Sequence, residues 1–146
     1  MTATEPEAGA PTEEDELQAL GEQLLRTAKS SRDRLAVHAL VEEQSILEVP
    51  AVRRALIIQT DDGEMAHFEG LRSLQFGLGL DKSQQAFLGL VLSMVSIGLT
   101  TLPAVQALDE RQLQVLLRAL LRLAGNETIA VGTRIGPAPR PGGDAT

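Results

Sequence analysis

The sequence predicts an α+β domain in which several helices pack on one side of a short, mainly antiparallel sheet. Three observations support this class. Leucine-rich segments with helical spacing occupy both halves of the chain, two β-rich segments flank an Asp-Gly pair, and a segment near the C-terminal end alternates in polarity. The length of 146 residues is that of one ordinary domain, so a single core is expected.

The two ends of the chain differ in composition from its middle. Residues 1–16 carry six acidic side chains and no base, and so account for most of the net charge of −7. The last eleven residues are rich in proline and glycine. Segments of such composition bury too little apolar surface to fold. We therefore predict a disordered acidic segment over 1–12, one domain over 13–135 that includes an N-terminal helical arm, and a disordered segment over 136–146.

The first ordered element is predicted to be a helix over 13–29. Thr12 and Asp15 have the spacing of a capping box, with Asp in place of Glu. A second helical pattern covers 35–47, and Ser31 marks either a break between two helices or a surface turn. The pattern leaves open whether one helix or two precede residue 48. The apolar face of the first helix consists of Leu17, Leu20, Leu24, Leu25 and Ala28.

A β-hairpin is predicted over 53–68. Its first half is rich in β-branched and apolar residues and follows Pro50, and its second half alternates in polarity. Between them, Asp62 and Gly63 form a two-residue turn of the type that needs positive φ. A hairpin alone is marginally stable in water, so we predict that the alternating segment 128–135 adds a third strand to the sheet.

Residues 83–108 contain no Asp, Glu, Lys or Arg, although 23% of the chain is charged. The apolar part, 86–99, is fourteen residues long, whereas a helix that spans a bilayer needs about 20. Pro103 interrupts the segment. We predict a helix over 83–102 that is buried in the core or bound to a partner. Insertion into a membrane surface is an alternative, although interfacial helices usually carry Lys and Arg on their polar face.

The last helix is predicted to begin near Pro103 or Asp109 and to end at Gly125. Separations of seven and four residues place three arginines in one row on this helix. The row is either a solvated face or a docking face for an acidic partner, or for the chain's own acidic segment. The arginines are Arg111, Arg118 and Arg122. The leucines expected to pack inward are Leu113, Leu116, Leu117, Leu120, Leu121 and Leu123.

Side chains that catalysis requires are scarce. The chain has no cysteine, and its two histidines, His38 and His67, lack the close spacing of metal ligands. Gly77 and Gly79 lack the third glycine and the Lys-Ser or Lys-Thr of phosphate-binding loops. We therefore predict no catalytic, cofactor-binding or metal-binding residue. An enzyme or metal-binding protein that works around the hairpin turn is an alternative, and its residues would be Asp61, Asp62, Glu64 and His67.

The composition also bears on partners and location. Trp and Tyr are absent, and the chain beyond its acidic start is nearly neutral, so we expect no nucleic-acid partner. The lack of cysteine and of a basic, apolar start predicts a cytoplasmic location.

The run from Val49 to Gly63, Val-Pro-Ala-Val-Arg-Arg-Ala-Leu-Ile-Ile-Gln-Thr-Asp-Asp-Gly, lies between an amphipathic helix and the apolar helix. This arrangement resembles the roadblock (dynein light-chain-like) family, over at most residues 35–102. Ala51 stands where that family usually has glycine. The resemblance implies a non-enzymatic dimer that scaffolds or regulates a small GTPase or a signalling complex, and it transfers no functional residue.

The sequence as a whole predicts a non-catalytic scaffold or regulatory module that forms a homodimer and binds another protein. It needs no cofactor. Apolar helix surface left over by the core would supply the interface. The candidate interface residues are Leu88, Leu90, Leu92, Val95, Arg111, Arg118 and Arg122.

Overall fold

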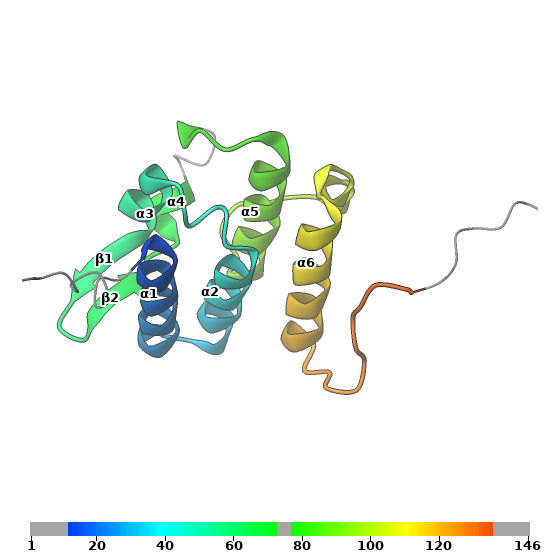
Figure 1. The fold of residues 1–146 in the computed structure, drawn as a ribbon, viewed down its shortest axis with the longest axis horizontal. Coiled ribbons are helices and arrows are strands. Elements are labelled where there is room, and N and C mark those ends of the chain that lie inside the picture. Colours follow the sequence, from blue (N-terminus) through cyan, green and yellow to red (C-terminus); the bar gives the residue numbers. More distant parts are fainter. Residues whose placement is uncertain (1–11, 73–76, 136–146) are drawn as a thin grey trace, which may run out of the picture.

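The computed structural model describes residues 12–72 and 77–135 (Figure 1). Helices dominate these residues, and a two-stranded antiparallel hairpin forms the sheet, which confirms the α+β class. The predicted disordered segments 1–12 and 136–146 lie outside the described residues, apart from Thr12. In chain order the elements are α1 (Glu13–Thr27), α2 (Ser31–Glu43), α3 (Pro50–Leu56), β1 (Ile57–Thr60), β2 (Gly63–Ala66), α4 (Glu69–Arg72), α5 (Lys82–Met94), the 3-10 helix η3 (Leu102–Ala107) and α6 (Glu110–Leu123).

Helix α2 is the centre of the molecule and packs against α1, α5 and α6. On its far side α1 packs against β2, so the hairpin lies at one end of the fold and α6 at the other (Figure 1). The core fills the space between the helices. Its buried side chains include Val37, Leu40, Phe87, Val91, Leu116 and Ala119.

Two helices, not one, precede residue 48. The capping box predicted at Thr12 is present, because its hydroxyl accepts a hydrogen bond from the Asp15 N–H at 3.0 Å. The chain then leaves the helix at Ala28, and the Ser30 hydroxyl caps α2 by accepting the Asp33 N–H at 3.1 Å. The break between α1 and α2 is therefore capped by the Ser30 side chain, one position before the residue at which we expected it.

The predicted hairpin is present but shorter than 53–68. Residues 53–56 belong to α3, because Pro50 occupies the first helical position, where its missing N–H costs nothing and its fixed φ suits a helix. The loop is also shifted by one residue. Thr60 pairs with Gly63, which leaves the two aspartates 61 and 62 as the loop and Gly63, at φ 114°, as the residue with positive φ.

The prediction of a third strand over 128–135 is wrong, because this segment is irregular. It follows α6, at the end of the fold away from the hairpin (Figure 1). Helix α1 supports the hairpin instead. The Gln23 side chain accepts the Glu64 N–H at 3.2 Å, and the Thr27 hydroxyl donates to the Glu64 carbonyl at 2.8 Å. Side chains of α1 thus form hydrogen bonds with the backbone of β2, where we expected a third strand to pair.

The charge-free segment forms a shorter helix than predicted. Helix α5 ends at Met94 instead of residue 102, and the next turn includes Ser96 and Gly98 with φ of 63° and 69°. Two residues with positive φ so close together cannot continue an α-helix. Pro103 then lies in η3, and α6 starts after Asp109, whose side chain accepts the Gln112 N–H at 2.7 Å.

Candidate functional site

The apolar residues predicted for a partner interface on α5 lie inside the molecule. Leu88, Leu90 and Leu92 have exposures of 0, 7 and 2%, and Val95 is half-buried. Helix α5 packs against α2, η3 and α6, which use these side chains in the core. The expected interface on this helix is therefore corrected: its leucines are not on the surface of the folded chain.

The three predicted arginines of α6 face α2 of the same chain. The Arg118 Nε and Nη2 atoms lie 2.7 and 2.5 Å from Glu42 Oε2, and Arg122 Nη1 lies 3.9 Å from Glu42 Oε1. Arg111 donates to the carbonyls of Glu42, at 3.3 Å, and of Glu43. A guanidinium beside the carbonyl end of a helix is favourable for the helix dipole. The acid that this row binds is thus on α2, and we call the contact of these five residues the arginine seam.

Glu43 anchors the seam from within the core. This carboxylate is 1% exposed, and it accepts hydrogen bonds from the Ser45 hydroxyl at 2.6 Å, the Ile46 N–H at 3.0 Å and the Gln112 side chain at 3.1 Å. Gln84 of α5 donates to the Ser45 hydroxyl at 3.0 Å. Buried carboxylates need such partners, and this set of hydrogen bonds joins α2, α5 and α6.

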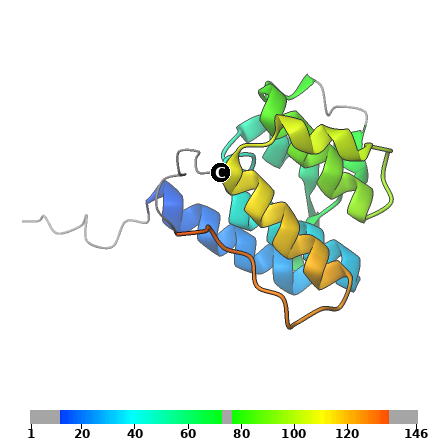
Figure 2. The same cartoon turned by 90° about the vertical axis from the view of Figure 1, so that its right-hand side faces the viewer.

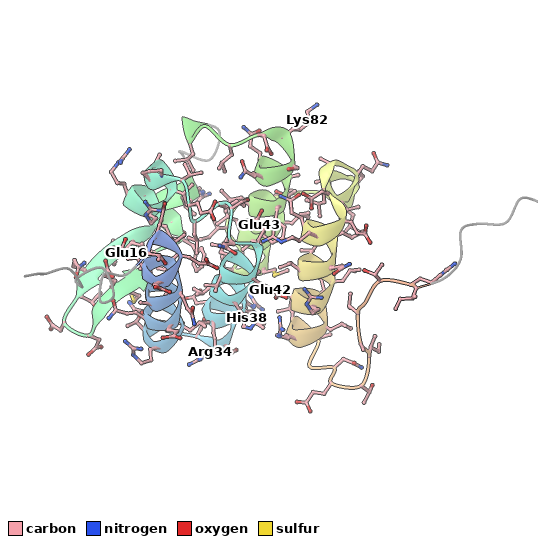
Figure 3. All side chains as sticks on the ribbon, in the orientation of Figure 1. Glu16, Arg34, His38, Glu42, Glu43 and Lys82 are labelled. Atoms are coloured by element: carbon pink, nitrogen blue, oxygen red, sulfur yellow. The ribbon has the colours of Figure 1, made fainter. Side chains whose placement is uncertain are left out.

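His38 lies at the edge of the seam, one helical turn before Glu42 (Figure 3). Its Nδ1 is 3.6 Å from Glu42 Oε1, and neither of these two buried atoms has a hydrogen bond. Burial lowers the pKa of His38 below 6.5, Arg122 lowers it further, and Glu42 opposes both effects. The imidazole therefore favours its neutral form beside the two arginines.

An exposed apolar surface, which the sequence did not predict, lies on the side of α6 that faces away from the arginine seam. Leu113 is 36% exposed, and Leu117, Leu120 and Leu123 are each 40% exposed. We call these four residues the outer leucine face. The prediction that they pack inward is wrong, whereas the inward position of Leu116 is confirmed and Leu121 is half-buried. The residues of α6 that are buried are Gln112, Val115, Leu116 and Ala119.

The segment after α6 leaves the outer leucine face partly open. It turns at Gly125, and Gln114 donates to the Thr133 hydroxyl at 2.8 Å, so the segment runs back along the helix. In Figure 2 it passes beside α6, and no described element crosses in front of the helix. Ile129 and Ile135 of this segment are themselves 59 and 94% exposed. Apolar side chains of both elements therefore remain at the surface.

In the described part of the chain Lys29, Asp33, His67 and Glu69 line one small pocket, but no set of side chains forms a metal site. No three His, Cys, Asp or Glu side chains there are placed to share a metal ion, including those at the hairpin turn. A groove of about 460 Å³ lies between α1 and the α3–β1 segment. Acids, arginines, one glutamine and apolar residues line this groove, and they include no Ser, Thr or His that could act as a nucleophile or as its usual base.

Within residues 12–72 and 77–135, none of the helices combines the length and apolar character needed to cross a membrane. Comparisons of the chain with protein-family profiles, with curated proteins and with solved structures gave no match. The resemblance to the roadblock family therefore stays a prediction.

Proposed function

We propose that this chain is a non-catalytic protein-interaction module that docks its partner on the outer leucine face of α6. The observation that supports this proposal is the orientation of the helix. A surface helix normally turns its apolar side to the core and its charges to water. Helix α6 instead directs its arginines toward α2 and leaves Leu113, Leu117, Leu120 and Leu123 exposed by 36–40%.

The energetics favour a covering partner. Burying a whole leucine side chain stabilises by about 1.5–3 kcal/mol, so covering the exposed part of four leucines is worth about 2–4 kcal/mol. Their helical spacing is also the pattern by which helices bind in or along apolar grooves. The neighbouring arginines, Arg111, Arg118 and Arg122, already contact groups of α2. Docking on this face would therefore not desolvate an arginine that lacks a partner.

The sequence adds finer expectations to this proposal. The lack of cysteine accords with a cytoplasmic module. The resemblance to the roadblock family suggests a role in scaffolding or regulating a small GTPase or a signalling complex.

Site-specific photo-crosslinking in cells tests the proposal. A photoreactive amino acid at Leu117 should yield defined covalent adducts with a protein, because this side chain would lie in the interface. The same amino acid at Leu99, which is 90% exposed and lies outside α6, is the matched control. Equal labelling at both positions, or no adduct at Leu117, would contradict the proposal.

A further inference from the structure

We infer that the partner on the outer leucine face is a second copy of this chain, with the two α6 helices antiparallel about a two-fold axis near Leu117. This inference rests on the proposed function and names its partner.

The two ends of the given sequence, which lie outside the described residues, offer almost no large apolar side chain for this face. Beyond the described residues, 1–11 contain Met1 as their one large apolar residue, and 136–146 contain none. The segment beside α6 leaves its own Ile129 and Ile135 exposed. None of these segments carries an apolar stripe that matches the leucines, whereas a second copy of α6 does.

The charges near the face favour a neutral apolar partner over an acidic one. Leu113, Leu117 and Leu120 are spaced by four and three residues, so they form a stripe that contains no charged side chain. Arg118 and Arg122 are paired with Glu42, and Arg111 is bonded to carbonyls at the end of α2. The stripe of a second copy is apolar in the same way, and a two-fold axis places each stripe on the other.

The ends of α6 favour the antiparallel direction. Its first turn carries Glu110 and its last turn carries Arg122. Antiparallel helices bring unlike ends and opposite dipole charges together, whereas parallel helices bring like ends together. An interface of standard size buries about 800 Å² on each partner, which is more than four leucines supply. The exposed Ile129 and Ile135 beside the helix add to the apolar area that a second copy could cover.

Light scattering coupled to size-exclusion chromatography of the whole chain, over micromolar concentrations, tests the partner. We expect a mass near twice 15.6 kDa. Leu117→Gln should raise the dimer Kd about tenfold or more, because each dimer loses two central leucines. Leu99→Gln makes the same chemical change at a 90% exposed site outside α6 and should leave the Kd unchanged. Thermal unfolding followed by circular dichroism shows whether both variants are folded.

Cysteine cross-linking tests the direction, since the natural chain has no cysteine. Oxidation should join two copies of Leu117→Cys, near the axis, far more efficiently than two copies of Leu113→Cys, which antiparallel helices hold apart. Equal cross-linking at both positions would indicate parallel helices and overturn this arrangement.

A monomeric wild-type chain, or a dimer that Leu117→Gln leaves intact, would overturn the inference. A monomer whose Leu117 still forms photo-adducts with a different protein would retain the proposed function. A monomeric chain that also forms no photo-adducts at Leu117 would contradict both proposals.

Discussion

Glu42 on α2 accepts a hydrogen bond from Nε of Arg118 on α6 at 2.7 Å, and Nη2 of the same guanidinium lies 2.5 Å from Glu42 Oε2 in an ion pair. At 3.6 residues per turn, Arg118 lies about 140° around the helix from Leu113. Holding Arg118 against α2 therefore turns the outer leucine face away from the core. This ion pair between residues 76 positions apart acts together with the buried Val115, Leu116 and Ala119, which lie on the side of α6 that meets the core.

Arg118→Met should lower the free energy of unfolding by about 1 kcal/mol. The pair is about one-quarter to one-third exposed, so solvent screens it and the loss stays near the upper range of surface ion pairs. Urea unfolding at low and moderate salt measures the change. Arg54→Met, on an exposed arginine of α3, is the control. An equal effect of both substitutions would show that the Glu42 contact contributes nothing specific.

Glu43→Gln should cost about 2 kcal/mol of stability. Three donors converge on the buried carboxylate of Glu43, and an amide in its place offers one oxygen and adds two N–H groups. Urea unfolding compares this variant with Glu48→Gln, which makes the same change at an exposed site and should be nearly neutral. A neutral Glu43→Gln would mean that the hydrogen bonds rearrange without cost.

Stability should fall as the pH drops below about 6.5, in part because of His38. Burial and Arg122 lower the pKa of His38 in the folded chain below 6.5, so in this range the unfolded chain binds more protons. The free energy of unfolding then decreases as the pH falls from 6.5 toward the folded-state pKa. Urea midpoints between about pH 7.5 and 5.5 measure the slope.

His38→Gln should flatten that slope, because the variant has no imidazole to protonate beside Arg122. His67→Gln retains His38 and is the matched control. A slope that is unchanged in His38→Gln would assign the pH dependence to other groups.

Gly70→Ala should destabilise the fold by about 2–3 kcal/mol. A Cβ atom at this position would collide with the Ala55 carbonyl oxygen, where α4 packs closely against α3, and a backbone group cannot rotate away. Gly132→Ala is the control, since a Cβ atom there would have no neighbour within 4 Å. Thermal unfolding compares the two variants, and similar melting temperatures would contradict the close approach.

Short-range signals were readable from the sequence. The capping box at Thr12 depends on two side chains three residues apart, the end of α6 depends on the positive φ of Gly125, and both features are present. The α+β class and the existence of the hairpin followed from periodicity and a turn. The arginine row was also recognised, although its acid on α2 was not.

Only the tertiary structure decided which surfaces are free. The leucines of α5 and of α6 have similar helical spacing, yet those of α5 are buried and four of those on α6 are exposed. Likewise, Gln23 and Thr27 of α1 support the hairpin in place of the predicted third strand. These outcomes depend on contacts between residues 37 to 76 positions apart, such as Thr27 with Glu64 and Arg118 with Glu42. Local periodicity identifies an apolar or charged face, but packing against distant segments determines which face meets the core.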